Sequence, residues 1–348
     1  MTSLSLAIPR RRLLQAGAAV AGASLVAKPA IVKAAEPIKI RVGYQFGLVY
    51  APVLLMRATD AIKKYMPDAS IEFVRVASGG VVRDLMIAKQ LDIGVLGPPP
   101  FQIGWQFLNL KYLVGTGIFP YQLVTWRDDL KSLKDFKPDD KIAVPGLGSL
   151  QHILLAMAAK RQLGDARALD KNLVALPHPD ATAAILSKNP GVAAHFANIP
   201  FVFTELDTPG VRVVLDGADA FGGRFVSPLA FAPPEYIEKN PLAVALFIAA
   251  YNDAIAMLNL DPDGSAKLLS ADIKQSPETL KRWLTWPGMT FTSFPYGTMG
   301  WHKFMLEAGY IKKAPAALPD ICSNQLLAWI GLEAGGKKNP AQQLQDGA

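Results

Sequence analysis

Short apolar runs alternate with segments of helical periodicity in the first third of the chain. The pattern predicts strands over 38–44, 71–76, 92–96 and 113–116, and helices over 51–65, 81–89 and 101–109. Between the third of these strands and the third helix, Gly97-Pro98-Pro99-Pro100 predicts a rigid turn. Strands and helices in this order favour parallel pairing with right-handed crossovers.

The alternation continues on a smaller scale over residues 121–225, and the rest of the chain is mostly helical. Strands are expected at 142–144, 173–176, 192–196 and 211–215; residues 122–125 begin this block, and residues 229–232, after it, are short and apolar. Helices are expected at 128–136, 149–163, 179–187, 234–240, 241–258, 265–269, 277–284, 300–308 and 321–329. The helix over 241–258 is expected to be strongly amphipathic, and no apolar run has the length and flanks of a mature transmembrane helix. Residues 336–348 are predicted to form a loose tail.

The stretch from Lys141 to Leu155 combines a strand, a glycine turn and a helix start. An apolar run over 142–144 is ended by Pro145 and by glycines that permit a sharp turn, and Ser149 is a good N-cap for the following helix. Free backbone N–H groups and the positive helix end then form a pocket floor suited to an oxyanion or an electron-rich ring edge. A plain turn that contacts nothing is the alternative. The stretch is not a nucleotide P-loop, because no Gly-Lys-Ser/Thr follows at the required spacing.

The basic character of the chain is concentrated at its N-terminus. The formal net charge is +7, but residues 1–34 contain five of the 36 basic residues and none of the 29 acidic ones. The remainder is therefore almost neutral, which removes the main support for nucleic-acid binding. Cys322 is the only cysteine, so no internal disulfide can form, and a buried thiol is expected.

The N-terminal segment has the pattern of an export signal. Arg10-Arg11-Arg12-Leu13-Leu14-Gln15 fits a twin-arginine motif, a mild apolar stretch follows over 16–26, and Val32-Lys33-Ala34 offers a cleavage site before Ala35. Residues 1–34 are therefore predicted to be a twin-arginine signal peptide, with export by the Tat machinery to the periplasm. An ordinary amphipathic N-terminal helix is the alternative.

Several stretches, in this order, resemble the periplasmic substrate-binding proteins of the nitrate/sulfonate/taurine ABC-importer family, which also includes binding proteins for thiamine-pyrimidine precursors. The matching stretches are 40–44, 90–94 running into 97–101, 141–145 with Gly148-Ser149, 194–201, 211–215 and 240–256. The resemblance covers roughly residues 38–330, and its specificity lies in the ordered set rather than in any single stretch.

The resemblance implies an α/β fold of two lobes, a type II periplasmic binding protein with a mixed sheet in each lobe and a two-strand hinge. Lobe one would comprise residues 36–120 and 226–335, and lobe two residues 121–225. A small-molecule solute would be bound between the lobes by hinge closure. An ABC permease and its ATPase at the inner membrane would be the partners, and the protein is expected to be a monomer.

Candidate ligand contacts come from both predicted lobes. They are Gln45, Tyr50, Gly97, Pro98 and Pro99 in the first lobe, and Gly148, Ser149, Gln151, His152, His195 and Asn198 in the second. Some of these residues have a structural alternative: Gln45 as a solvated loop residue, Ser149 as a helix cap alone, and His195 as a satisfied buried histidine. Ring stacking is open to Tyr50, Trp105, Tyr121 and Phe221. Arg83 and Arg224 are the cations expected nearest the cleft, with a solvated position as the default.

No motif points to catalysis. The four histidines are far apart in the sequence, no Gly-x-Ser-x-Gly elbow is present, and no metal or cofactor is expected. The expected function is capture of a small oxyanion such as an alkanesulfonate, taurine or nitrate for import. A neutral or aromatic solute such as a thiamine-pyrimidine precursor, and a sensor-linked binding protein, remain open. An enzyme is the remaining class, and it has the least support.

Overall fold

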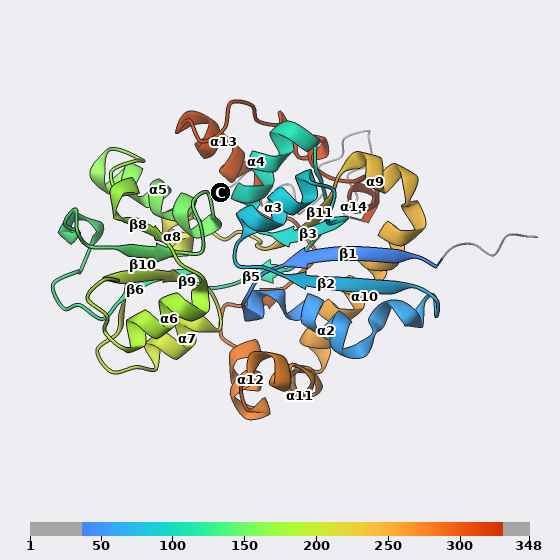
Figure 1. Cartoon of the computed structure of the whole chain (residues 1–348), viewed down its shortest axis with the longest axis horizontal. Helices are drawn as coiled ribbons and strands as arrows, with labels where there is room; N and C mark the ends of the chain where they lie inside the picture. Colours follow the sequence, from blue (N-terminus) through green and yellow to red (C-terminus); the bar gives the residue numbers. More distant parts are fainter. Residues whose placement is uncertain (1–36, 330–348) are drawn as a thin grey trace, which may run out of the picture. The chain divides into compact units, whose positions relative to one another are not determined.

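Two five-stranded mixed sheets form the framework of the computed structural model, which describes residues 37–329. The predicted signal peptide, 1–34, and the predicted tail, 336–348, lie outside the described residues. Each sheet is flanked by helices and forms one lobe (Figure 1). The two-lobed α/β architecture expected from the sequence is confirmed.

The first sheet has the strand order β2-β1-β3-β11-β4. Its strands are β1 (Lys39–Tyr44), β2 (Ser70–Arg75), β3 (Ile93–Leu96), β4 (Lys111–Gly115) and β11 (Leu229–Ala232). β1 pairs in parallel with β2 and β3, as predicted, but β11 runs antiparallel between β3 and β4. The expected parallel pairing was therefore wrong for the fourth strand, because a strand more than 100 residues later takes the place beside β3.

Helices cover both faces of the first sheet (Figure 1). α3 (Gly79–Ile87) and α4 (Pro98–Leu108) lie on one side, and α2 (Ala51–Thr59) and α10 (Pro241–Leu260) on the other. The helix predicted over 51–65 is interrupted at Asp60, which adopts the left-handed conformation and separates α2 from the 3₁₀ helix η2 (Ala61–Lys64). Another 3₁₀ turn, η1 (Leu48–Tyr50), precedes α2.

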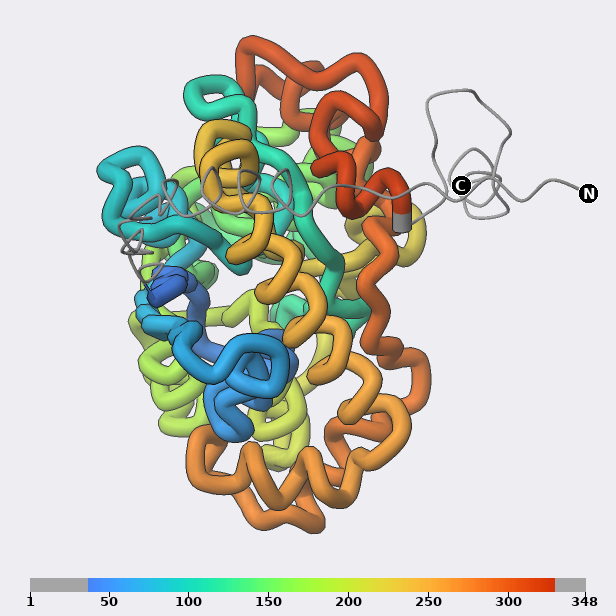
Figure 2. Tube along the Cα trace, turned by 90° about the vertical axis from the view of Figure 1, so that its right-hand side faces the viewer, coloured from blue at the N-terminus to red at the C-terminus, as the bar shows by residue number. Residues whose placement is uncertain are grey.

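Helix α10 is the longest helix that the structure describes, and it packs beside α2 (Figure 2). Its buried side chains recur at helical spacing from Ala243 to Leu258, so one face belongs to the core. The other face is also largely apolar, so the expectation of a strongly amphipathic helix was wrong. Among residues 37–329 this is the one helix long and apolar enough to cross a membrane by length and composition. Half of that span is buried within the protein, as in the core helix of a globular fold.

The rest of the C-terminal part adds short helices around the first lobe. They are α9 (Pro234–Lys239), α11 (Pro262–Ile273), α12 (Pro277–Leu284), α13 (Thr298–Glu307), the 3₁₀ turn η5 (Leu318–Asp320) and α14 (Asn324–Trp329). Cys322, which precedes α14, is buried as expected, and burial raises the pKa of its thiol to about 12.

The second sheet has the order β10-β6-β9-β7-β8. Its strands are β6 (Gln122–Thr125), β7 (Ile142–Val144), β8 (Leu173–Ala175), β9 (Ala194–Ala197) and β10 (Arg212–Asp216). α5 (Leu150–Leu163), α6 (His178–Leu186), α7 (Phe201–Leu206) and α8 (Gly217–Phe221) surround it, with the 3₁₀ turn η4 (Asp170–Asn172) before β8. The helix predicted over 128–136 was wrong: this stretch contains only the 3₁₀ turn η3 (Leu133–Asp135), capped by Ser132.

Two segments connect the lobes, one before β6 and one between α8 and β11. The first segment contains β5 (Gly117–Ile118), which pairs with β12 (Thr290–Phe291). The main hydrophobic cluster includes side chains of both sheets, for example Val42 and Leu123. The two sheets therefore contribute to one continuous hydrophobic cluster.

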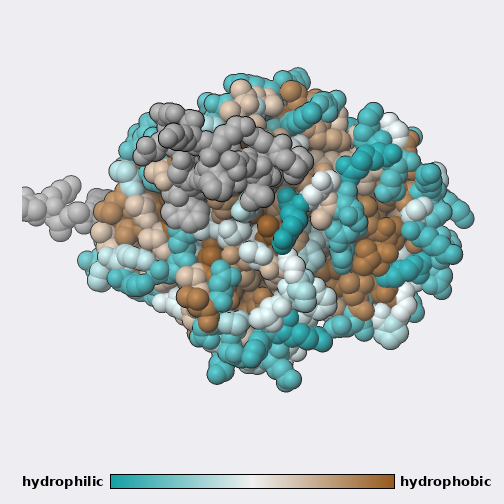
Figure 3. Space-filling view, turned by 180° about the vertical axis from the view of Figure 1, so that it is seen from behind, coloured by the Kyte–Doolittle hydropathy of each residue, from teal (hydrophilic) through white to brown (hydrophobic). Residues whose placement is uncertain are grey.

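Seen from behind, the surface is mainly hydrophilic, with an apolar area bordered by hydrophilic side chains over the lobe on the right (Figure 3). More than half of the surface of a folded protein normally consists of apolar atoms. This area alone therefore identifies no interaction site.

Candidate functional site

A small pocket lies where residues of both lobes meet, and we call it the interlobe pocket. The first lobe and the returning segment contribute Gln45, Tyr50, Gly79, Gly97, Pro100 and Ser227; the second lobe contributes Tyr121, Ser149, Leu150, Gln151, His178 and Asn198. Its volume is about 20 Å³, about the space of one water molecule. In this conformation the pocket is too small for an organic solute.

The N-termini of four helices converge on this pocket. Gly79 and His178 are the first residues of α3 and α6, and Gly97 and Ser149 are the N-caps of α4 and α5. Each helix end carries a partial positive charge from its aligned peptide dipoles. The pocket is therefore electropositive without a basic side chain.

The start of α5 shows how the amides are arranged. The Ser149 hydroxyl accepts a hydrogen bond from the His152 amide at 3.3 Å, which confirms Ser149 as the N-cap. The Gly148 amide donates to His152 Nδ1 at 2.8 Å, and the Ser149 amide donates to the Gly146 carbonyl. Among the described residues, the amides of Leu150 and Gln151 have no partner and can donate to a bound group.

The start of α4 differs from the prediction. Pro98, Pro99 and Pro100 form its first turn instead of a turn preceding a helix at residue 101. Proline suits this position, because its φ is already helical and the N–H that it lacks would have no intrahelical partner. α4 therefore contributes its dipole and an apolar wall to the pocket, but the three prolines provide no amide donors.

Hydroxyl and amide side chains complete the lining. Gln45 Nε2 donates to the Tyr50 hydroxyl at 2.6 Å, which leaves the Tyr50 proton available to a ligand. The Tyr121 hydroxyl donates to the Ser227 carbonyl at 3.0 Å. Asn198 is only 4% exposed, and its Oδ1 has no hydrogen-bond partner among the described residues. This oxygen is an acceptor, so it can take a hydrogen bond from a donor on a bound group.

No Arg, Lys, Asp or Glu lines the interlobe pocket among the described residues, and His178 and two tyrosines are its only ionisable groups. Burial raises the pKa of Tyr50 well above its usual value, so its hydroxyl stays protonated. Within residues 37–329, no three His, Cys, Asp or Glu side chains gather as metal ligands would. The site can hold a solute through hydrogen bonds and helix dipoles.

The lobes touch at several glycines around the pocket. The Leu48 amide donates to the Ile199 carbonyl at 2.8 Å across the lobes. A β-carbon added at Gly97 would lie 3.0 Å from Leu150 Cβ, and one added at Gly146 would lie 3.2 Å from Ser78 Cβ. The lobes are therefore in a closed arrangement, and a solute can enter only when they separate.

The pocket brings together six of the eleven residues proposed from the sequence: Gln45, Tyr50, Gly97, Ser149, Gln151 and Asn198. The other five, Pro98, Pro99, Gly148, His152 and His195, do not line it. Tyr121, an expected stacking residue, does. Trp105, Phe221, Arg83 and Arg224 are not among the lining residues.

The two proposed histidines that miss the pocket have other contacts. His152 Nδ1 accepts from the Gly148 amide, so Nε2 carries the proton and faces Asp170 Oδ1 at 3.3 Å. Desolvation lowers the pKa of His152, whereas Asp170 opposes this shift. His195 is fully buried and contacts His178 and Glu205. It is the satisfied core histidine that the sequence analysis gave as the alternative.

His178 is the most informative residue that the sequence analysis missed. It follows β8 through Pro177 and begins α6, the same strand–turn–helix pattern that singled out Ser149. That pattern could have identified it. Ser227 lies in the segment that returns to β11, and no sequence feature marks it.

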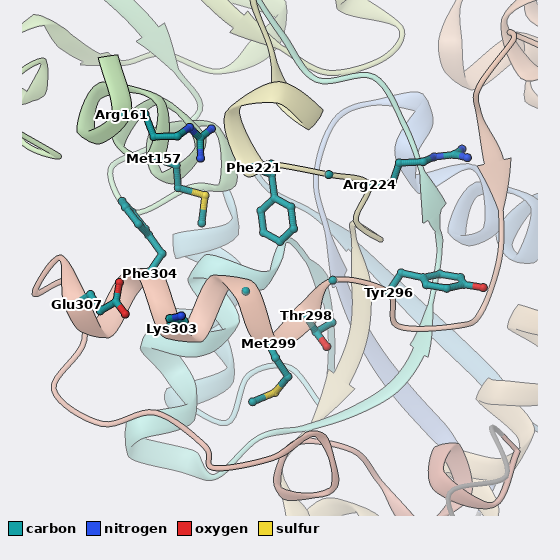
Figure 4. A pocket seen from close by; sticks show the side chains of 14 residues that line it. Met157, Arg161, Phe221, Arg224, Tyr296, Thr298, Met299, Lys303, Phe304 and Glu307 are labelled. Atoms are coloured by element: carbon teal, nitrogen blue, oxygen red, sulfur yellow. The ribbon is translucent and has the colours of Figure 1, made fainter. Parts of the chain in front are cut away.

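A larger crevice, of about 450 Å³, lies between α5, α8 and α13 (Figure 4). Met157, Phe221 and Phe304 project into it, whereas the Arg224 side chain extends away. Arg161 already donates to the carbonyls of Asp219 and Ala220, and α5 and α8 present their C-terminal ends here. Lys303 also lines this crevice and α13 begins here at Thr298, so the crevice contains hydrogen-bond donors as well.

No protein-family model matches the chain, and no curated protein matches it by sequence. Solved structures do match. The periplasmic aliphatic sulphonate binding protein SsuA from Escherichia coli is 23% identical, covers 83% of this chain and 92% of its own, and has a TM-score of 0.62. The alkanesulfonate-binding protein SsuA from Xanthomonas axonopodis pv. citri, bound to MOPS, is 21% identical, with coverages of 85% and 98% and a TM-score of 0.65.

The periplasmic nitrate-binding protein NrtA from Synechocystis PCC 6803 is 14% identical, covers 86% of this chain and 89% of its own, and has a TM-score of 0.66. The TM-scores over most of both chains show a shared fold, and identities below 25% show no more than that. The chain therefore has the fold of the periplasmic binding proteins, and sulfonate- and nitrate-binding proteins are among its structural neighbours.

Proposed function

We propose that this protein is the periplasmic solute-binding component of an ABC importer and that it captures a small oxyanion between its lobes. An alkanesulfonate, taurine and nitrate are the candidate solutes. The observation that carries the proposal is the convergence of four helix N-termini on a buried interlobe pocket. Helix N-termini bind anions through free amides and aligned dipoles.

The binding cycle begins with the lobes apart. A solute would meet the amides at the starts of α3, α5 and α6 and the hydroxyls of Tyr50, Ser149 and Ser227. Closure would then bring the remaining donors onto it and exclude water, which strengthens each hydrogen bond. The solute itself would fill the space that is collapsed in the closed arrangement.

We propose the lobe boundaries as 36–120 with 226–335, and 121–225, since each sheet draws its strands from one of these sets. Export by the Tat machinery, residence in the periplasm and delivery of the solute to a permease and its ATPase belong to the same proposal. The structural neighbours are binding proteins, which supports capture rather than turnover. A sensor that presents the bound solute to a membrane protein would use the same pocket.

A neutral or aromatic solute, such as a thiamine-pyrimidine precursor, is the second candidate. The lack of Arg and Lys among the described lining residues favours it, as do the two tyrosine rings of Tyr50 and Tyr121. Such a solute would need acceptors as well as donors, and Gln151 and the Tyr121 hydroxyl offer them.

Thermal unfolding of the full chain with a solute panel separates these candidates. The panel contains nitrate, taurine, ethanesulfonate and a neutral aminopyrimidine, in an amine buffer free of sulfonates. A solute present at 100 times its Kd stabilises the folded state by about 2.7 kcal/mol, which raises Tm measurably. We expect a shift with at least one oxyanion. A shift with the pyrimidine alone would reject the oxyanion, and turnover of a bound compound would reject a pure binding role.

A further inference from the structure

A line of buried side chains leads from the interlobe pocket into the second lobe. Gln151 Nε2 lies 3.1 Å from His178 Nε2, and His178 Nδ1 lies 2.8 Å from His195 Nε2. On its far side, His195 Nδ1 lies 2.6 Å from Glu205 Oε1. We call His178, His195 and Glu205 the buried relay. It connects the first residue of α6, the middle of β9 and α7.

The relay ends at a carboxyl group with too few partners. His195 and Glu205 are fully buried and His178 is 4% exposed. Thr182 donates to Glu205 Oε1 at 2.6 Å, but Oε2 has no hydrogen-bond partner among the described residues. A buried carboxylate with one unpaired oxygen is costly, so the relay gains stability from an additional proton.

The hydrogen bonds restrict where the protons lie. Glu205 Oε1 accepts, so His195 Nδ1 carries a proton. If both imidazoles are neutral, His195 Nε2 accepts from His178 Nδ1 and His178 Nε2 accepts from Gln151 Nε2, which leaves the Gln151 oxygen for the pocket. With Glu205 ionised, the relay then has a net charge of −1. One more proton on the two imidazoles places a proton on His178 Nε2, whichever ring donates to the other. His178 then donates to the Gln151 oxygen, the turned Gln151 amide offers its NH2 group to the pocket as a donor, and the relay is neutral overall.

We propose that His178 determines which class of solute the pocket accepts, and that binding of an oxyanion is coupled to uptake of one proton by the buried relay. This inference rests on the proposed function. Nitrate and a simple alkanesulfonate offer only acceptors, so they are opposed both by the Gln151 oxygen and by the net negative charge of the deprotonated relay. One proton from the solvent removes both conflicts. A solute with its own N–H donor binds the deprotonated relay without taking up a proton.

Among the titratable groups around the pocket, the buried relay is the one that can take up the proton. The other acidic residues on α6 and at the end of α7, Asp180 and Asp207, are exposed, and Asp207 pairs with Arg282. On α5, His152 faces Asp170. Tyr50 and Tyr121 face the pocket as neutral phenols, and Phe201 stacks on the His178 ring at 5.3 Å.

Burial, and secondly the neighbouring His195, lower the pKa of His178 well below its usual value. The free protein therefore holds His178 neutral at neutral pH. Because the complex contains one more proton, linkage makes the affinity rise as pH falls, by about tenfold for each pH unit. A solute that needs no proton would bind equally well throughout this range.

Calorimetric titration measures the proton directly. The full chain is titrated at pH 7 with nitrate, taurine and ethanesulfonate in bis-Tris and again in imidazole, amine buffers with different ionisation enthalpies. Sulfonate buffers are avoided because they are themselves alkanesulfonates. The difference in heat between the buffers gives the number of protons taken up. We expect about one proton for nitrate or ethanesulfonate, with an affinity about tenfold higher at pH 7 than at pH 8, and no proton for taurine, whose ammonium group supplies its own N–H donors.

Two variants remove the coupling at opposite ends of the relay, and a third is a matched control. Glu205→Gln removes the carboxylate, and His178→Gln replaces the imidazole that contacts Gln151 by an amide. Each variant should bring the proton uptake near zero and flatten the pH dependence of the affinity. If one of these variants does not fold, the proton uptake of the other tests the proposal. His302→Gln makes the same change at a buried histidine outside the pocket and should leave the uptake at one.

Binding of nitrate or ethanesulfonate without proton uptake in the unaltered protein, or uptake that persists in both relay variants, would overturn the relay while leaving oxyanion capture intact. Absence of binding of all three oxyanions would instead reject the proposed function, and the relay inference with it.

Discussion

Closure of the lobes can be tested with one added methyl group at Gly97. This residue has ordinary extended backbone angles, φ −66° and ψ 157°, so alanine causes no backbone strain there. In the closed arrangement its β-carbon would lie 3.0 Å from Leu150 Cβ and 3.3 Å from Leu150 Cδ1. Leu150 belongs to the second lobe, so Gly97→Ala should penalise closure and leave each lobe almost unchanged.

The size of the effect follows from the packing. Overfilling a close-packed site costs about 1–3 kcal/mol. If the lobes keep the close approach of Gly97 to Leu150 when they close on the solute, this penalty raises the apparent Kd by about 5- to 150-fold. The unfolding free energy of the free protein should change by less than about 1 kcal/mol, the usual size of an N-cap substitution.

The assay is calorimetric titration combined with small-angle X-ray scattering, with and without solute. Gly80→Ala is the matched control, since its β-carbon meets nothing nearer than 3.7 Å. Gly146→Ala is a second substitution against closure, since its β-carbon would lie 3.2 Å from Ser78 Cβ. Gly146 does not line the pocket, so this variant separates an effect on closure from direct contact with the solute. Unchanged affinity and compaction in both Gly97→Ala and Gly146→Ala would refute the closure argument.

Two further predictions concern stability. Ser149→Ala removes the cap of α5 and should lower the unfolding free energy by about 1 kcal/mol in urea titrations; no change would show that the cap is dispensable. His302 is buried, and burial lowers its pKa to about 3, whereas the unfolded chain has a value near about 6.5. The unfolded state therefore binds more protons between these values, so stability should fall by about 1.4 kcal/mol per pH unit as pH drops within this window. His302→Gln should remove this contribution, and identical pH profiles for the two proteins would contradict it.

The local elements follow closely from sequence periodicity and capping. Ser149 was identified as the N-cap of α5 from its place after a glycine turn, and the structure confirms the hydrogen bond to His152. The start of α4 was displaced by three residues because a run of prolines indicates a turn as readily as a first helical turn. Both signals act over only a few residues, which is why one element was identified and the boundary of the other was missed.

The pairing of strands depended on longer distances. Nothing in Leu229–Ala232 indicates that this strand runs antiparallel between β3 and β4. Its position is decided by the path of the chain after it returns from the second lobe. The same holds for Ser227, which enters the pocket only because the strand that follows it takes that central place.

The sequence by itself determined the α/β alternation, most of the helix starts and six residues of the candidate pocket. Periodicity, turns and caps depend only on residues that are close together in the sequence. The tertiary structure alone decided that His178 faces the pocket while His195 stands behind it, joined to Glu205. It also decided that the starts of four helices meet at one point. These juxtapositions join residues from Gln45 to Ser227, and only packing between separate elements brings such distant positions together.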